Sequence, residues 1–190
     1  MSKVCFIHTD TTGLHPSHNE NITKKNLFEF SRMVTFSWII ASKLENGKYN
    51  IDKREYFIIK PRCMYIHPNT VQYHGITQEI ALKKGHDIED VLEKFIKDIY
   101  DIKYIISHSL EFHMKTVQGE LVRYNKNMNF RKHILIDINS FEHKIQPSTL
   151  KNIYQVTFNK KILDKTQIID SVCELFFKLY DDYSKKIISE

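Results

Sequence analysis

The order of strand-like and helix-like segments constrains the fold of this chain more than any other feature of its sequence. Three runs rich in β-branched and aromatic residues come first, at Val4 to Ile7, Met33 to Ala41 and Asn50 to Ile59. The unbroken apolar character of the first run is typical of a strand buried on both faces, so we expect it near the centre of a sheet. The turn Glu45-Asn46-Gly47 predicts a β-hairpin between the other two runs.

Helices and strands alternate in the rest of the chain. His86 to Tyr100 places its apolar residues on one helical face, and Glu111 to Tyr124 is a second segment with helical character. We also expect strands at Lys103 to Ile106 and His133 to Ile138, and helices at Ser148 to Phe158 and Lys165 to Ile188. This order predicts an α/β fold in which a five-stranded mixed sheet is flanked by helices, as a single domain over residues 1–190.

Composition limits the class of protein without deciding it. Hydrophobic residues make up 42% of the chain and charged residues 27%, as in ordinary soluble proteins, and the net charge of +5 weakly favours a polyanionic partner. The three cysteines, Cys5, Cys63 and Cys173, form no CxxC pair, which indicates neither a disulfide framework nor a zinc knuckle. No signal peptide and no membrane-spanning run is indicated. We expect an intracellular, soluble protein, cytoplasmic or nuclear, without a membrane partner.

Short motifs follow two of the strands and begin the last helix. The first strand leads into the turn Thr11-Thr12-Gly13-Leu14, and His8 and Asp10 come just before that turn. The segment Ile105 to His113 is another apolar strand that runs into a polar turn and ends in Phe112-His113. Near the end of the chain, Lys165 precedes Asp170 by five residues.

In this order, the motifs resemble those of the DEDDh family of 3′–5′ exonucleases, of the proofreading-subunit and ribonuclease T type. Four intervening segments resemble the same family, namely Tyr56 to Pro61, His74 to Thr77, Ile136-Asp137 and Pro147 to Tyr154. The resemblance therefore spans nearly the whole chain, and it implies a ribonuclease H-like fold.

The resemblance also implies a chemistry, two-metal hydrolysis of phosphodiester bonds. In that family four carboxylates hold two divalent ions and a histidine activates water. The matching catalytic positions of this chain are His8, Asp10, His113 and Asp170, with Lys165 in place of the histidine. Four carboxylates thus become two, and a lysine adds a positive charge. Because Mg²⁺ prefers oxygen ligands, we do not expect a magnesium pair at this site.

Two interpretations of the substituted site stay open. Asp10 and Asp170, with His8 and His113 as further candidate ligands, suit a single divalent transition metal such as Zn²⁺, Mn²⁺ or Fe²⁺. Alternatively, the replaced carboxylates leave a cleft that holds no metal. Lys165, being normally protonated, does not suit a general base but suits a direct contact with a phosphate.

The resemblance also indicates residues that would hold a nucleic-acid end. These candidates are the turn residues Thr11, Thr12, Gly13 and Leu14, with His108 and Ser109 after the fourth strand. A simpler interpretation makes the first four a strand-ending turn. His74 is interpreted as a turn histidine.

Three functions follow from these observations. The first is a protein with the exonuclease fold that binds single-stranded DNA or RNA at a 3′ end, with weak or no hydrolysis. The second is an active 3′–5′ exonuclease with an altered, manganese- or zinc-type metal site. The third is a scaffold subunit that keeps the fold in order to bind other protein subunits.

Overall fold

Five strands form one mixed sheet. In the computed structural model, which describes residues 3–16, 21–44, 49–140, 149–162 and 168–183, the sheet order is β3-β2-β1-β4-β5. The strands are β1 (Lys3–Thr11), β2 (Met33–Lys43), β3 (Tyr49–Ile58), β4 (Tyr104–Ser107) and β5 (Ile134–Asp137). The predicted five-stranded mixed sheet is confirmed, and β1 lies at its centre.

Strand direction decides which ends of the strands meet. β1 pairs with β2 in antiparallel fashion and with β4 in parallel, and β4 pairs with β5 in parallel. β2 and β3 are antiparallel neighbours, as the predicted hairpin requires, although the turn Glu45-Asn46-Gly47 lies outside the described residues. Since β1, β4 and β5 run in the same direction, the segments that follow them gather at one edge of the sheet.

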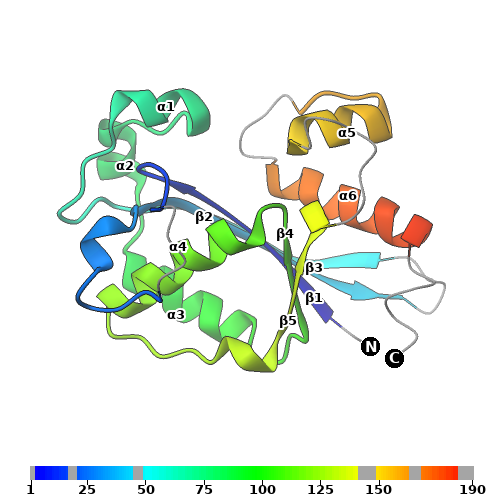
Figure 1. Cartoon of the computed structure of the whole chain (residues 1–190), viewed down its shortest axis with the longest axis horizontal. Helices are drawn as coiled ribbons and strands as arrows, with labels where there is room; N and C mark the ends of the chain where they lie inside the picture. Colours follow the sequence, from blue (N-terminus) through cyan, green and yellow to red (C-terminus); the bar gives the residue numbers. More distant parts are fainter. Residues whose placement is uncertain (1–2, 17–20, 45–48, 141–148, 163–167, 184–190) are drawn as a thin grey trace.

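Helices cover both faces of the sheet (Figure 1). The helices are α3 (Ile88–Asp98) and α4 (Leu110–Arg123) on one face, and α5 (Leu150–Phe158) and α6 (Ile168–Tyr183) on the other. Residues of β1 alternate between the two layers, because successive side chains of a strand point to opposite faces. Cys5 and Ile7 pack in the layer of α3 and α4, whereas Val4 and Phe6 pack in the layer of α5 and α6.

Two short helices between β3 and α3 were not predicted. They are α1 (Pro68–His74) and α2 (Gln78–Lys84), and each has seven residues. A third apolar cluster, Val34, Ile66, Ile76 and Ala81, holds this region against β2. Three single turns of 3-10 helix complete the described part, at Leu27–Glu29, Phe130–Lys132 and Ile138–Ser140.

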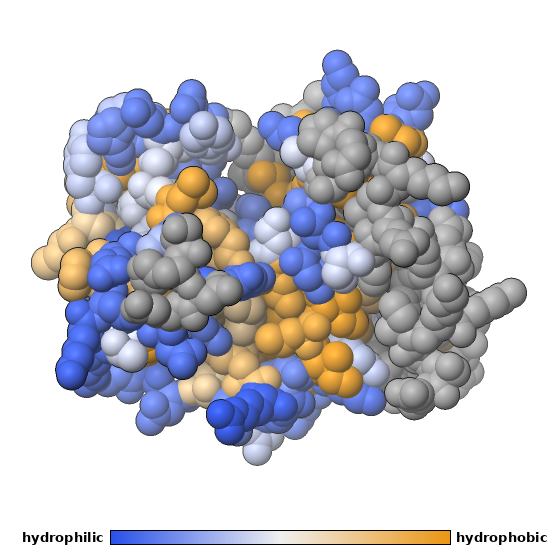
Figure 2. All heavy atoms as spheres, in the orientation of Figure 1, coloured by the Kyte–Doolittle hydropathy of each residue, from blue (hydrophilic) through white to orange (hydrophobic). Residues whose placement is uncertain are grey.

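The face shown in Figure 2 carries an apolar area where α4 and β5 lie in Figure 1. The edge strand β5 contributes Ile134 and Leu135, which are 46% and 44% exposed.

Among the described helices, none has the length and apolar character needed to cross a membrane.

Candidate functional site

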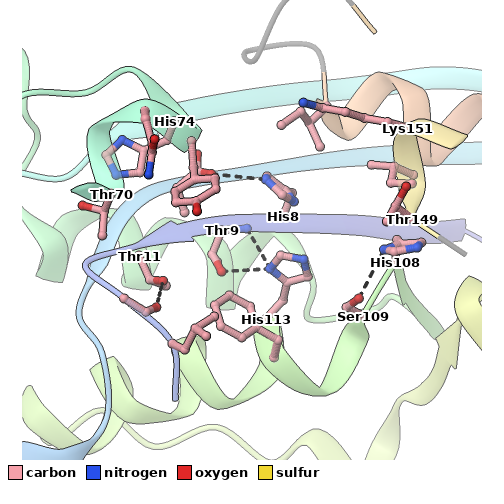
Figure 3. Close-up of a pocket in the computed structure, with 18 of the residues that line it drawn as sticks. His8, Thr9, Thr11, Thr70, His74, His108, Ser109, His113, Thr149 and Lys151 are labelled. Carbon is pink, nitrogen blue, oxygen red and sulfur yellow. Dashed lines mark hydrogen bonds and ion pairs between the residues drawn. The ribbon is translucent and has the colours of Figure 1, made fainter. Parts of the chain in front are cut away.

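A pocket of about 1010 Å³ opens at the ends of β1 and β4. Four segments that are far apart in sequence surround it, namely the end of β1, α1, the start of α4 and the start of α5 (Figure 3). The lining residues are His8, Thr9, Asp10, Thr11, Gly13, Leu14, Asn69, Thr70, Gln72, Tyr73, His74, His108, Ser109, Phe112, His113, Thr149, Leu150, Lys151, Ile162 and Ile168. Asp10 is the only carboxylate among these described residues.

Asp10 is held by a hydroxyl and faces a histidine. Thr35 Oγ1 of β2 donates to Asp10 Oδ2 at 2.5 Å, and His8 Nε2 lies 3.6 Å from Asp10 Oδ1. Burial alone would raise the pKa of Asp10, but His8, the hydroxyl of Thr35 and the more distant His74 together hold it below its ordinary value. Asp10 is therefore ionised at neutral pH and supplies one negative charge to the pocket.

The imidazole of His113 reaches the pocket from the first turns of α4, and its proton position is fixed. The backbone N–H of Thr9 donates to His113 Nδ1 at 3.1 Å, and Thr9 Oγ1 lies 2.9 Å from the same nitrogen. Burial, followed by the charge of His8, lowers the pKa of His113 well below 6.5, so the ring is neutral. Because Nδ1 accepts a hydrogen bond, the proton of the neutral ring sits on Nε2.

This tautomer bears on metal binding. With Nδ1 occupied by the Thr9 N–H and Nε2 protonated, His113 presents no free lone pair to a cation. Within the described ranges, no three His, Cys, Asp or Glu side chains are arranged to hold a metal ion.

His8 lies close to both Asp10 and His113. Its ring centroid is 4.7 Å from that of His113, and its Nε2 is a buried atom that has no hydrogen-bond partner in the described part of the chain. Alternation along β1 places His8 and Asp10 on the same face of the sheet. The structure thus brings the candidates His8, Asp10 and His113 together.

The turn after β1 is tied down by hydrogen bonds. Thr11 Oγ1 donates to the carbonyl oxygen of Gly13 at 2.5 Å, and Thr12 exchanges hydrogen bonds with Arg32. Thr11, Gly13 and Leu14 line the pocket, and Leu14 is 86% exposed, whereas Thr12 is not among the lining residues.

His15 anchors the next step of this loop. Its Nε2 lies 3.2 Å from the carbonyl oxygen of Phe112, to which it donates, and 2.9 Å from Thr116 Oγ1. His15 Nδ1 is 3.1 Å from the hydroxyl of Ser31. The loop that follows β1 is therefore fastened to α4, the helix that carries His113.

His108 and Ser109 enter the pocket from the turn after β4. Ser109 has a positive φ of 60°, and its Oγ lies 3.2 Å from His108 Nδ1. The carboxylate of Asp137, at the end of β5, accepts the backbone N–H groups of Ser109 and Leu110, both at 2.9 Å. Asp137 therefore caps α4 and fixes the direction in which that helix leaves the sheet.

Two of the predicted catalytic residues are not placed in this group. Asp170, in the first turn of α6, forms an ion pair with Arg54 of β3 and is not among the residues that line the pocket. Lys165 lies outside the described residues. The spacing between Lys165 and Asp170 resembled a motif, but the structure directs the Asp170 carboxylate to the edge strand.

Several lining residues were not expected from the sequence. They are Asn69, Thr70, Gln72, Tyr73 and His74 of α1, Phe112 of α4, and Thr149, Leu150 and Lys151 at the start of α5. Gly75, with a φ of 78°, ends α1, and the N–H of Ile76 donates to His74 Nδ1 at 3.0 Å. His74 was interpreted as a turn histidine, but it is the last residue of α1, and the tertiary structure brings the end of that helix to the pocket.

No protein-family model matches the sequence, and no curated protein matches it. Solved structures do match: exonuclease I of E. coli, in complex with a dA16 oligonucleotide, superposes with a TM-score of 0.72 over 95% of this chain at 14% identity. Exonuclease I of Methylocaldum szegediense gives a TM-score of 0.71 over 97% of this chain, also at 14% identity.

A third structure, the zinc-bound form of an E. coli exonuclease I complex with single-stranded DNA, gives a TM-score of 0.55 over 73% of this chain at 18% identity. The sheet order and the covering helices, together with these superpositions, define the fold as the ribonuclease H-like fold of exonucleases. This chain spans 41%, 42% and 28%, respectively, of the three matched chains, less than half of each. At these identities, the likeness establishes the fold alone.

Proposed function

We propose that this protein binds the 3′ end of single-stranded DNA or RNA in the pocket at the end of β1, and hydrolyses it weakly or not at all. The observation that carries the proposal is the set of polar groups at that strand end. Asp10 supplies a single carboxylate, His8 lies beside it, and the ring of His113 lies against that of His8. The fold is the one in which E. coli exonuclease I was solved with a dA16 oligonucleotide.

The described residues do not fit a pair of magnesium ions. Such a pair takes several oxygen ligands, and its two positive charges need carboxylates to offset them. Asp10 is one carboxylate, the Asp170 carboxylate pairs with Arg54, and the lone pair of His113 Nδ1 is used by the Thr9 N–H. Binding without rapid turnover is the behaviour that this arrangement supports.

The test is a combined binding and degradation assay. Purified protein is incubated with 5′-labelled single-stranded DNA and RNA in EDTA, Mg²⁺, Mn²⁺ and Zn²⁺. The proposal expects shifted oligonucleotides of which at most a small fraction is shortened under any of the four conditions. Absence of binding to both DNA and RNA would overturn it.

A second candidate, an exonuclease with an altered metal site, is favoured by one contact. His8 Nε2 has no hydrogen-bond partner in the described residues and lies 3.6 Å from Asp10 Oδ1, and an imidazole beside a carboxylate suits Zn²⁺ or Mn²⁺. In the same assay, this candidate expects shortened products with Mn²⁺ or Zn²⁺ that disappear in Asp10→Ala. Such products would replace the first proposal with the second.

A further inference from the structure

The two sides of the pocket differ in chemistry. In Figure 3, Thr70 and His74 of α1 lie on one side, Lys151 and Thr149 lie on the other, and His8 and His113 lie between them. Among the lining residues of α1, only His74 can carry a charge, and only in its protonated form. The α5 side carries a lysine, Lys151. All the residues that make this difference lie in the described part of the chain.

The α5 side is basic beyond Lys151. Lys160 and Lys161 follow the last turn of α5 and immediately precede Ile162, which itself lines the pocket. All three lysines are exposed, and none forms an ion pair with a residue in the described ranges. Lys151 lines the pocket, and Lys160 and Lys161 adjoin it through Ile162, so their exposed ammonium groups can attract the phosphates of a nucleic-acid strand that leaves the pocket on this side.

The α1 side offers an aromatic ring and amides. Tyr73 is 72% exposed although it lines the pocket, and Asn69 and Gln72 line the same side. An exposed tyrosine ring is a stacking surface for a base, and stacking depends little on which base is present. Amide side chains can donate to and accept from base edges.

We infer that a single strand lies in this pocket in one orientation, with its phosphate backbone along Lys151, Lys160 and Lys161 and the base of its end nucleotide against Tyr73. This inference rests on the proposed function. It assigns the phosphates to the α5 side of the pocket and the base of the end nucleotide to the α1 side. With a volume of about 1010 Å³, the pocket is large enough for a whole nucleotide rather than a lone phosphate.

The test measures how affinity depends on salt, because only phosphate contacts release counterions. Binding of a fluorescent single-stranded oligonucleotide is followed by anisotropy over a range of KCl concentrations for wild type, Lys151→Ala and Lys160→Ala/Lys161→Ala. For every phosphate that a variant no longer neutralises, the slope of log K against log[salt] should become shallower by about 0.7. The matched control is Lys83→Ala/Lys84→Ala, which removes two exposed lysines from α2, outside the pocket, and should keep the wild-type slope.

Tyr73→Ala tests the contact of the end base with the α1 side of the pocket. The variant should bind about 5- to 150-fold more weakly with an unchanged salt slope, because stacking releases few ions. An oligonucleotide whose 3′ nucleotide lacks a base should bind wild type more weakly to the same extent, and Tyr73→Ala should weaken its binding no further. The residues changed here are all exposed, and far-UV circular dichroism checks that each variant is folded.

Three outcomes would overturn the inference. They are an unchanged slope in both Lys151→Ala and Lys160→Ala/Lys161→Ala, an equal reduction in the α2 control, or a Tyr73→Ala affinity equal to that of wild type. Any of these, with a wild type that binds, leaves the proposed function standing. A wild type that binds no oligonucleotide overturns both.

Discussion

At the scale of single residues, His113 makes a contact that a carboxylate could also make. Its Nδ1 accepts the backbone N–H of Thr9, and an aspartate oxygen at this position could accept the same hydrogen. The difference lies in charge, since the histidine is neutral and an aspartate would be negative. A histidine or an aspartate at this position could therefore keep the hydrogen bond from Thr9 while differing by one negative charge.

Adding carboxylates should strengthen cation binding. In His8→Asp/His113→Asp, Asp10 would be joined by two further carboxylates, and we expect Mn²⁺ and Mg²⁺ to bind at least about tenfold more tightly than to wild type. Isothermal titration calorimetry measures the affinity. Adding Asp10→Ala to the variant serves as the control and should reverse much of the increase. Equal cation affinity in wild type and the double variant would contradict the expectation.

The buried His113 should also make stability depend on pH. Burial lowers its pKa in the folded protein well below 6.5, so below about pH 6.5 the unfolded chain binds a proton there that the folded chain does not. The free energy of unfolding of wild type should fall by up to about 1.4 kcal/mol per pH unit through this group as the pH falls from 6.5. The decrease continues until the pH reaches the folded pKa.

His113→Asn should remove that contribution, because the asparagine amide can accept the Thr9 N–H and does not titrate. Urea unfolding at several pH values between 7.5 and 5 should give a shallower dependence for the variant. His15 and His133, whose pKa values are also lowered mainly by burial, contribute alike to both proteins. Identical pH dependences would show that His113 does not titrate as described.

At the scale of elements, the direction of α4 depends on one carboxylate. Asp137 accepts the N–H groups of Ser109, Leu110 and Asn139, each at 2.9 Å, and thereby joins the end of β5 to the first turn of α4. The helix carries His113 into the pocket and also receives His15 from the loop after β1. Loss of the hydrogen bonds to Asp137 should therefore affect the pocket as well as the stability of the protein.

Asp137→Ala should lower the free energy of unfolding by about 1–3 kcal/mol, since helix N–H groups would be left without a charged acceptor. Asp137→Asn keeps an acceptor oxygen and should cost less. Urea denaturation of the three proteins gives the comparison. If the alanine and asparagine variants are equally stable, the cap contributes through something other than these hydrogen bonds.

At the scale of the whole molecule, the two apolar layers share the central strand. β1 places Cys5 and Ile7 in one layer and Val4 and Phe6 in the other, so disruption of β1 removes contacts from both. Trp38, fully buried in the α3 layer, donates through Nε1 to Asp98 Oδ2 at 3.0 Å and reports on that layer. The proposal of a single domain predicts that both layers unfold together.

Urea unfolding followed by Trp38 fluorescence and by far-UV circular dichroism should therefore give coincident transitions. The fluorescence reports the layer of α3 and α4, while the dichroism includes the helices α5 and α6 of the other face. A dichroism transition at clearly lower urea than the fluorescence transition would mean that the α5 and α6 layer unfolds by itself.

The strands and the long helices could be predicted from the amino-acid sequence. Apolar and β-branched runs predicted all five strands, and periodic apolar residues predicted α3, which Asp87 starts by accepting the N–H of Glu89. These are local signals, because each depends on neighbours within a few residues. They also predicted the order of elements, from which the mixed sheet followed.

The contacts between side chains at the pocket depend on how distant segments pack in three dimensions. The Thr9 and His113 contact joins residues 104 positions apart, and Asp170 pairs with Arg54, 116 positions away, although its spacing from Lys165 matched a motif. The seven-residue α1 was missed for a related reason, since a helix so short is stable only when packed against other elements. Contacts between distant segments leave no periodic pattern in the sequence, so folding alone sets them.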